Sequence, residues 1–327
     1  MYNVRKIEEN INICGEFRGR ILYDEPLAEK TTFKVGGNAA IFIQPKDFES
    51  MKIALTAIEK AGIPFVVLGG GSNVVIPDEG IKYAVVNTSD IDFIDFDESK
   101  SVLRCGAGCS IKSIIDFCFE NHLGGLEKFS GLPGSIGGAT FMNARCYDYS
   151  ISDVFVSANY ISSNTKSCDL NDNSECKKYS CYVYNKEDWD YKKSPFQTYL
   201  SDCIILSVEL SVKKIDNNQL EQMKCDIEKY FNDRVIKGHF KFPSAGSVFK
   251  NNRNFGKPSG QIIDEVNLKG FSIGDAQVAP WHGNFIINKG CAKSKDIKDL
   301  VNYISNVVYK KNGFKLESEI IFIESVK

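Results

Sequence analysis

Four glycines lie within eight residues of an otherwise apolar stretch, Gly131–Ala139, and this spacing restricts the possible folds more than any other feature of the chain. Glycines inside an apolar run are typical of backbone that approaches a neighbour or a flat or phosphorylated ligand closely. A second such segment, Gly69-Gly70-Gly71-Ser72-Asn73, follows a predicted strand. Its main-chain N–H groups can converge on an anion, and Ser72 and Asn73 add side-chain hydrogen bonds. The two glycine-rich segments together predict a dinucleotide held between two lobes. The alternative for each segment is a compact turn between strands.

The segment Gly69–Asn73 is neither a P-loop nor a Rossmann fingerprint. It lacks the Gly-Lys-Ser/Thr of the former and the third spaced glycine of the latter.

Composition indicates a globular protein of two or three domains, since 327 residues are too many for one average core. The chain is 43% hydrophobic and 25% charged, and its formal net charge of -2 predicts no basic surface for nucleic acid. No run reaches the roughly 18 apolar residues of a membrane span, and the charged stretch 1–20 lacks the apolar core of a secretion signal. We expect a cytoplasmic protein without membrane insertion and without an obligate protein partner.

The 11 cysteines are scattered, form no CxxC pair and have no histidine nearby at metal-ligand spacing. Thiols of this kind are expected to stay reduced in the cytoplasm. The sequence therefore predicts no disulfide framework and no metal site.

Hydrophobic periodicity predicts an α+β fold. Residues 41–84 have the pattern of a strand, a helix that begins after Asp47 and ends at Gly62, and a second strand at 65–68. Further helices are expected at 111–119, at 216–234 with Leu220, Met223, Ile227 and Tyr230 on one face, and from a Ser294 cap to Gly313. Short strands are expected at 83–86, 91–96, 101–104, 154–161, 203–212 and 316–323, with a polar surface excursion at 162–180.

These elements group into three expected parts. Residues 1–80 form a first lobe, and residues 81–215, joined by the terminal strand 314–327, form a second lobe. Residues 216–313 form a substrate-binding domain.

Six motifs occur in an order that resembles the UDP-N-acetylenolpyruvoylglucosamine reductase family over residues 20–325. Three surround the glycine-rich segments: TTFKVGGNA at 31–39, LGGGSNVVIPDEG at 68–80 and GLPGSIGGATFMN at 131–143. Three more follow: YKKSPF at 191–196, PSAGSVFKN at 243–251 and LESEI at 316–320. Segments 260–270 and 273–288, the latter ending in HGNFIIN, resemble the family's substrate domain.

This resemblance implies non-covalently bound FAD in the two-lobed fold of the vanillyl-alcohol-oxidase/PCMH type, followed by a C-terminal α+β substrate domain. NADPH is then the expected hydride donor. The family places the pyrophosphate and flavin against the two glycine-rich segments, which implies as cofactor-binding residues Gly69, Gly70, Gly71, Ser72, Asn73, Pro133, Gly134, Ser135, Gly137, Gly138 and Asn143. The family's usual glycine after Met142-Asn143-Ala144 is Arg145 here, which leaves the form of that turn open.

The implied reaction is reduction of an enolpyruvyl ether, UDP-N-acetylglucosamine enolpyruvate. It needs a hydride at the terminal vinyl carbon and a proton at the neighbouring carbon, with negative charge spread into the carboxylate. By resemblance, Ser247 is the proton donor, while Lys192 and Glu319 hold and polarise the carboxylate. Lys192 stands where the family normally has arginine, so we expect charge stabilisation with looser orientation.

The resemblance also implies substrate contacts by Tyr191, Lys250, Asn251 and His282, although His282 could equally be structural. Only the short stretch 197–201 separates the Lys192 motif from the next strand, which resembles the family's shorter, type II branch. Two alternatives remain open: another FAD-dependent oxidoreductase of the same fold, and a catalytically silent flavin-binding relative.

Overall fold

The computed structural model describes residues 2–162 and 179–326. Most of the polar excursion expected at 162–180 therefore lies outside the described residues. The chain divides into two compact units. Unit 1 comprises Met1–Leu22, Phe42–Gly70 and Ala84–Phe231, and unit 2 comprises Tyr23–Ile41, Gly71–Tyr83 and Asn232–Lys327. The three-part division with boundaries at 80 and 215 stays a prediction.

One sheet has four strands, and the chain passes from one unit to the other within three of them. Its order is β1 (Gly19–Pro26), β2 (Asn38–Pro45), β5 (Ile81–Asn87) and β3 (Phe65–Leu68). The chain crosses the unit boundary within β1, β2 and β5. Strand β3 pairs in parallel with β5, so the connection between them must be a crossover.

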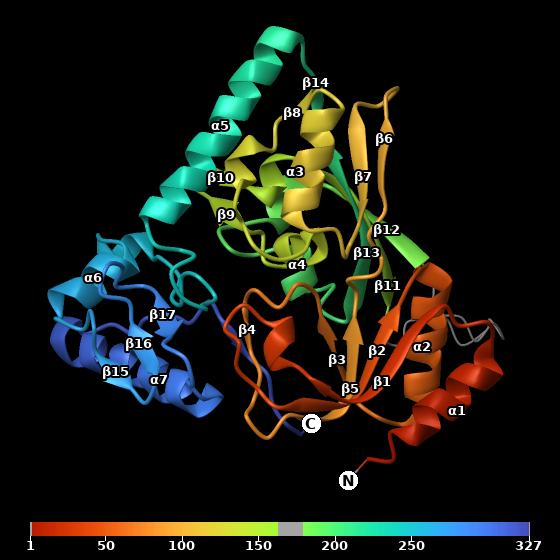
Figure 1. The fold of residues 1–327 in the computed structure, drawn as a ribbon, viewed down its shortest axis with the longest axis horizontal. Helices are drawn as coiled ribbons and strands as arrows, with labels where there is room; N and C mark the ends of the chain where they lie inside the picture. The colour runs from red at the N-terminus through yellow and green to blue at the C-terminus, as the bar shows by residue number, and fades with distance from the viewer. Residues whose placement is uncertain (1, 163–178, 327) are drawn as a thin grey trace. The chain divides into compact units, whose positions relative to one another are not determined.

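The strand–helix–strand prediction for residues 41–84 is confirmed. Helix α2 (Phe48–Ala61) begins where the Asp47 carboxylate accepts a 2.8 Å hydrogen bond from the Ser50 N–H, and it ends at Gly62 with φ of 64°. Helix α1 (Arg5–Cys14), which the sequence analysis did not predict, packs beside α2 (Figure 1). It buries Ile7 and Ile11, one turn apart.

The larger sheet of unit 1 is antiparallel and has five strands. Their order is β12 (Tyr179–Val183), β11 (Phe155–Ser162), β13 (Cys203–Ser211), β7 (Val102–Gly106) and β6 (Ile94–Asp97). Helix α3 (Ile111–Glu120) lies near it (Figure 1), capped by the Ser110 hydroxyl, which accepts from Ser113 N–H at 2.9 Å. All the strands expected in this region are present, although β6 begins three residues later than predicted.

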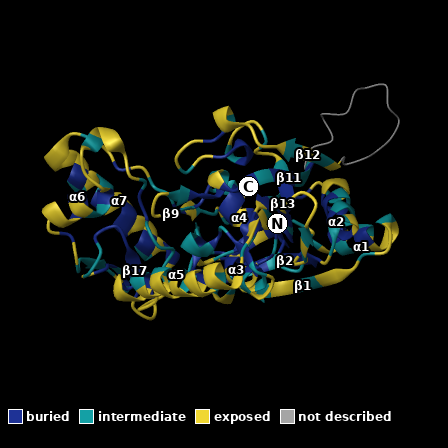
Figure 2. Ribbon diagram, turned by 90° about the horizontal axis from the view of Figure 1, so that it is seen from above, coloured by how far each residue is buried: buried dark blue, intermediate teal, exposed yellow. Residues whose placement is uncertain are grey.

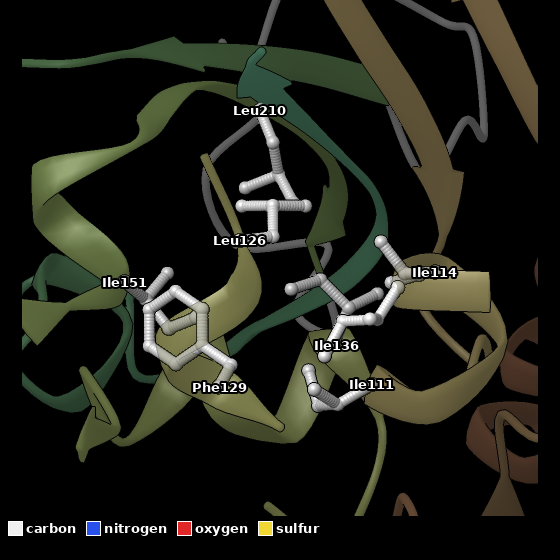
Figure 3. Close-up of a pocket in the computed structure, with 8 residues that line it drawn as sticks. Ile111, Ile114, Leu126, Phe129, Ile136, Ile151 and Leu210 are labelled. Carbon is white, nitrogen blue, oxygen red and sulfur yellow. The ribbon is translucent and has the colours of Figure 1, made fainter. Parts of the chain in front are cut away.

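A small cavity lies in the core beside this sheet. Figure 3 shows the side chains that surround it, and all of the lining residues are apolar: Ile111, Ile114, Ile115, Leu126, Phe129, Ile136, Ile151 and Leu210. Its volume is about 10 Å³, and it offers no polar side chain. It is therefore a packing gap that could hold neither a cofactor nor a sugar nucleotide.

The remaining short elements of unit 1 connect these layers. Strand β8 (Leu123–Gly124) pairs with β14 (Lys213–Lys214), and β9 (Arg145–Cys146) forms a hairpin with β10 (Tyr149–Ser150). The glycine-rich segment Gly131–Ala139, for which no helix was predicted, leads into the short helix α4 (Ile136–Phe141).

Helix α5 (Asn217–Ile236) leads the chain from unit 1 into unit 2 and is exposed along most of its length (Figure 2). The predicted apolar face is confirmed. Met223 is buried, and Leu220 and Ile227 pack against the core of unit 1. Tyr230 lies 5.0 Å, between ring centroids, from Tyr147 at the tip of the β9–β10 hairpin.

Unit 2 contains helices α6 (Ser259–Glu265) and α7 (Ser294–Asn312) and the antiparallel sheet β15 (Ser272–Ile273), β16 (Ala276–Val278) and β17 (Ile286–Asn288). Strand β18 (Ile321–Phe322) pairs in parallel with β4 (Val74–Val75). Phe33, Val35 and Val75 join one core with residues of α6 and α7. Segments from the beginning of the chain thus complete the interior of this unit.

Two predicted boundaries in unit 2 are wrong. The cap of α7 is Lys293 rather than Ser294, because the Ser294 hydroxyl accepts instead from the Asp78 N–H at 3.0 Å. The terminal strand is shorter than 316–323, because residues before Ile321 contribute only an isolated bridge between Ser318 and Phe249. The predicted end of α7 at Gly313, with φ of 80°, is confirmed.

Candidate active site

The two glycine-rich segments meet inside unit 1. The Gly70 N–H donates to the Ser135 hydroxyl at 3.3 Å. A Cβ added to Gly70 would lie 2.6 Å from the Gly134 Cα, and one added to Gly69 would lie 2.7 Å from Ser135 Oγ. At position 70 the obstacle is backbone, so only glycine permits this approach, whereas a side chain at position 69 would have to displace the Ser135 hydroxyl.

Helix α4 begins at this contact and presents bare backbone. Ser135 is its N-cap and accepts from the Gly138 N–H at 3.4 Å. A Cβ on Gly137 would lie 2.9 Å from the Ala107 carbonyl oxygen, so Gly137 faces the interior. Gly138 is exposed, and a Cβ there would meet only Ser135 Oγ, at 3.5 Å. The partly exposed main chain of Gly134 and the exposed main chain of Gly138, next to the exposed Pro133, fit a flat or phosphorylated group such as FAD.

Residues Gly71–Asn73, the rest of the segment Gly69–Asn73, belong to unit 2. Gly71 has φ of 63°, and a Cβ there would lie 2.0 Å from the Lys30 carbonyl oxygen. Its own carbonyl accepts from the Thr32 N–H at 3.1 Å. The next residue, Ser72, is partly exposed. Asn73 Nδ2 donates to the Glu319 carbonyl oxygen at 3.0 Å. This hydrogen bond joins the glycine-rich segment to the segment that carries the predicted catalytic residue Glu319.

Asn143, predicted to bind the cofactor, uses its side-chain amide inside unit 1. Nδ2 donates to the Asp190 carbonyl at 2.9 Å, and Oδ1 accepts from the Ser152 N–H at 3.0 Å. The residue is 3% exposed and has φ of 40°. Its cofactor role stays a prediction, but its amide fixes the segment that carries Lys192.

Lys192 occupies a tight turn. Asp190 and Lys193 exchange two main-chain hydrogen bonds, of 3.2 and 3.0 Å, and Lys192 between them has φ of 55°. Positive φ at this turn position favours glycine. Tyr191, the other turn residue, is 40% exposed, and its N–H donates to Asp190 Oδ1 at 2.7 Å. The turn thus carries both predicted ligand-contacting side chains at the surface of unit 1.

Two residues to which the sequence analysis gave no role hold this turn against α4. The Ser194 hydroxyl donates to the Phe141 carbonyl at 2.7 Å, and Gln197 Nε2 donates to the same oxygen at 2.6 Å. Ser194 is fully buried. The one sequence signal for this contact was the serine of the YKKSPF motif, because a serine hydroxyl that is buried needs a hydrogen-bond partner.

Ser247 and Glu319 lie on adjacent extended segments of unit 2, and the first of these, residues 247–251, is called the Ser247 strand below. Ser247 forms a bridge with Phe285, and the Glu319 N–H donates to the Val248 carbonyl at 2.7 Å. Lys250 N–H donates to the Glu317 carbonyl at 2.9 Å, which continues the same pairing. Both predicted catalytic side chains are partly exposed, and they come from segments 72 residues apart in the sequence. Lys192 is in unit 1, so the structure places two of the three predicted catalytic residues together within one unit.

Lys250 and Asn251 extend from the Ser247 strand. Lys250 Nζ lies 2.6 Å from Glu317 Oε1, an ion pair whose glutamate side chain is 72% exposed. Such exposed pairs are weak, so the ammonium can exchange this partner for a substrate anion at little cost. Asn251 Oδ1 accepts from the Ser259 N–H at 2.8 Å at the start of α6. That bond aligns the end of the strand with the helix.

His282 is held in one tautomer. Its Nδ1 accepts from the Asn284 N–H at 3.2 Å, so the ring proton is on Nε2 in the neutral form. Burial lowers the pKa of His282, and the ring lies 4.2 Å from the Phe285 ring. The His239 ring lies 4.7 Å from the same Phe285 ring, and burial and then Arg234 lower the pKa of His239 to about 4. Two neutral imidazoles therefore pack around the residue that pairs with Ser247.

The structure shows the form of the turn at Arg145, which the sequence left undecided. It begins β9 without positive φ, and its Nε donates to the Tyr147 carbonyl at 3.0 Å. Tyr147 adopts φ of 58° instead. Position 145 therefore does not require glycine in this chain.

Membrane spans and metal clusters can be judged for residues 2–162 and 179–326. Among them, no helix is long and apolar enough to cross a membrane. In the same part of the chain, no group of three or more histidine, cysteine, aspartate or glutamate side chains could hold a metal ion.

Comparison with known proteins gives a consistent assignment. A protein-family model described as "UDP-N-acetylenolpyruvoylglucosamine reductase, C-terminal domain" matches residues 238–323, and one described as "FAD binding domain" matches residues 39–170. The UDP-N-acetylenolpyruvoylglucosamine reductase of Treponema denticola is 43% identical over 329 residues, which cover 98% of each chain. The protein of the same name from Borreliella burgdorferi is 41% identical over 91% of this chain and 92% of its own length.

A solved structure agrees with this. The crystal structure of UDP-N-acetylenolpyruvylglucosamine reductase from Thermus caldophilus superimposes with a TM-score of 0.71 at 28% identity. The match covers 94% of this chain and 100% of the other.

Proposed function

Since this chain belongs to the UDP-N-acetylenolpyruvoylglucosamine reductase family, we propose that it reduces UDP-N-acetylglucosamine enolpyruvate to UDP-N-acetylmuramate for peptidoglycan precursors, with bound FAD and NADPH as hydride donor. The observation that carries this proposal is the pairing of the Ser247 strand with the Glu319 segment within unit 2. Substrate and reductant are both soluble metabolites, so the reaction belongs in the cytoplasm.

The bare backbone around α4 supports FAD as the cofactor. Gly134, Ser135 and Gly138 are proposed to hold it, with Gly70 packed against them. Gly71, Ser72 and Asn73 are proposed as further cofactor contacts. When bound, FAD supplies the hydride that the chain itself cannot provide.

The proton comes from the chain. Ser247 Oγ has no hydrogen-bond partner among the residues that the structure describes, so its proton is available to a ligand. A serine hydroxyl is a poor acid toward water, but a carbanion is basic enough to accept its proton. The Ser247 O–H bond breaks as a C–H bond forms at the carbon beside the carboxylate. The serine oxygen then recovers a proton from solvent.

Charge stabilisation is the role proposed for Lys192. Its ammonium is a compact charge on a turn fixed to α4, so it can face a carboxylate on which negative charge develops. Glu319 orients the same carboxylate through its position beside the Ser247 strand. Lys250 and Asn251 are the proposed contacts for the rest of the sugar nucleotide, together with Tyr191 and His282.

Anaerobic absorbance tests the proposal. The purified protein is reduced with one equivalent of NADPH and then mixed with UDP-N-acetylglucosamine enolpyruvate. Loss of the flavin band followed by its return establishes both half-reactions. A band that is lost but not restored indicates another flavin oxidoreductase with a different oxidant. The absence of a flavin band after reconstitution with FAD contradicts the proposal and favours a silent relative.

A further inference from the structure

Asn284 is a buried polar residue in unit 2 to which the sequence analysis gave no role. It lies between β16 and β17 and is 4% exposed. Its Oδ1 accepts from the Phe249 N–H at 2.9 Å, and its Nδ2 donates to the Phe249 carbonyl at 2.8 Å. One side-chain amide therefore satisfies both main-chain polar groups of one residue on the Ser247 strand. The main-chain N–H of Phe249 can only donate and its carbonyl can only accept. The oxygen of the Asn284 amide must therefore face the N–H, and its nitrogen must face the carbonyl.

The main chain of Asn284 is committed elsewhere. Its N–H donates to His282 Nδ1 at 3.2 Å, and its carbonyl accepts from the Val248 N–H at 2.9 Å. At the preceding residue, Gly283, an added Cβ would lie 2.3 Å from the Gly260 carbonyl, so the chain is pressed against α6. The side chain of Asn284 thus extends the pairing that begins at the Ser247–Phe285 bridge by one further residue.

This extension determines where the Ser247 hydroxyl points. Successive side chains of an extended strand point to opposite faces, so a change of register at Phe249 would turn Ser247 to the other face. On the opposite edge, the strand is held by the Glu319 N–H, at 2.7 Å from the Val248 carbonyl. The amide of Asn284 and the Glu319 segment therefore hold the strand from two sides.

We propose that Asn284 is a positioning residue for proton transfer from Ser247, acting through the backbone of Phe249. The inference rests on the proposed function, because it assigns Ser247 as the donor. It places no atom of Asn284 on the substrate or the cofactor. Its effect should therefore fall on the half-reaction that consumes the enolpyruvyl substrate and not on flavin reduction by NADPH.

Stopped-flow absorbance of the FAD-loaded full-length protein separates the two half-reactions. In Asn284→Ala, we expect flavin reduction by NADPH to stay within about twofold of the parent, since proton delivery to substrate is not involved. Reoxidation by substrate should slow by roughly tenfold to a hundredfold, the usual effect of a misplaced catalytic group. The solvent deuterium isotope effect on reoxidation should rise, because proton transfer limits the rate more strongly.

Asn288→Ala is the matched control. Asn288 is 2% exposed in β17, and its amide bonds to the carbonyl of Phe33 and the N–H groups of Gly290 and Ala292, not to the Ser247 strand. It should lose stability without the selective loss of reoxidation rate. If Asn284→Ala fails to retain FAD, Asn284→Ser, which keeps a hydroxyl at the site, takes its place in the same comparison.

A double-mutant cycle with Ser247→Ala decides how Asn284 acts. Two residues that act through one proton transfer are not additive. Adding Asn284→Ala to Ser247→Ala should therefore leave the already slow reoxidation unchanged. A further loss of similar size, or equal slowing of both half-reactions in Asn284→Ala, overturns the inference. A parent protein that substrate does not reoxidise overturns the proposed function instead, so the two failures are distinct.

Discussion

Asn143 donates a 2.9 Å hydrogen bond from Nδ2 to the carbonyl oxygen of Asp190, which joins the end of α4 to the turn that carries Lys192. Ser194 and Gln197 both donate to the Phe141 carbonyl and strengthen the same connection. A backbone that fits the cofactor and a predicted catalytic cation are thus parts of one hydrogen-bonded assembly in unit 1.

Replacement of Asn143 should separate its two contributions. Asn143→Ala removes two partly buried hydrogen bonds and leaves alanine, which has no polar side-chain group, at φ of 40°. We expect it to lower the free energy of unfolding by about 2–3 kcal/mol. Asn143→Gly loses the same bonds without the strain and should cost about 1 kcal/mol less. Urea denaturation measures both, and equal losses would show that the backbone at 143 is not strained.

Gly70→Ala and Gly138→Ala distinguish packing from cofactor binding. At Gly70 the new methyl group would lie 2.6 Å from the Gly134 Cα, so the variant should lose about 1–3 kcal/mol of stability. At Gly138 the nearest atom is 3.5 Å away and the position is helical, so alanine should stabilise the protein without FAD by about 0.5–1 kcal/mol. Its methyl group would nevertheless cover the bare backbone. Titration with FAD should show weaker binding, and unchanged affinity would remove Gly138 from the cofactor site.

Lys192 should show opposite effects on stability and activity. Lys192→Gly relieves positive φ at the turn and should raise the free energy of unfolding by about 1 kcal/mol, yet lower turnover by loss of the charge. Lys192→Arg keeps the charge and adds a planar fork, so it should preserve or raise turnover. Steady-state kinetics and thermal unfolding of the two variants test this. Complete loss of turnover in Lys192→Arg would remove Lys192 from the catalytic set.

Acid should destabilise unit 2 through His239. Its pKa falls from 6.5 to about 4 on folding, so between these values the unfolded chain binds a proton that the folded chain does not. The free energy of unfolding is therefore not reduced by His239 above pH 6.5, and it decreases as the pH falls toward 4. Since the side chain is partly solvated, we expect a loss of about 1–2 kcal/mol. His239→Asn cannot titrate, and its Oδ1 can still accept from Arg234. Denaturation at pH 7 and pH 4.5 should show a smaller pH dependence in this variant.

Local signals predicted helix ends well. Asp47, Gly62 and Gly313 act as caps or stops because each determines the conformation of its own neighbours. The Ser294 cap was wrong because the hydroxyl accepts from Asp78, 216 residues away. Helix α4 was missed because its glycines are intrinsically poor helix formers, and packing on Ala107 overrides that preference.

Motifs located the site segments but not the directions of their side chains. The string Met142-Asn143-Ala144 places Asn143 beside a cofactor loop, yet its amide points to Asp190 and Ser152. Asn284 lies in the HGNFIIN motif, but no role was predicted for it. Nothing in the sequence indicates that its hydrogen-bond partner is the backbone of Phe249. Hydrogen bonds between distant segments depend on the tertiary fold, and one sequence does not contain their geometry.

The link between Asn73 and Glu319, 246 residues apart, has a consequence for the order of folding. During synthesis, strand β4 leaves the ribosome long before β18, its parallel partner, exists. Contacts of such long range form slowly, and an unpaired strand edge invites association with other chains. Unit 1, whose segments all precede residue 232, can become compact first. The pairing that brings the Ser247 segment beside Glu319 is then among the last to form, so a nascent chain can fold helix α4 and its bare backbone before it can complete the proposed proton-donating site.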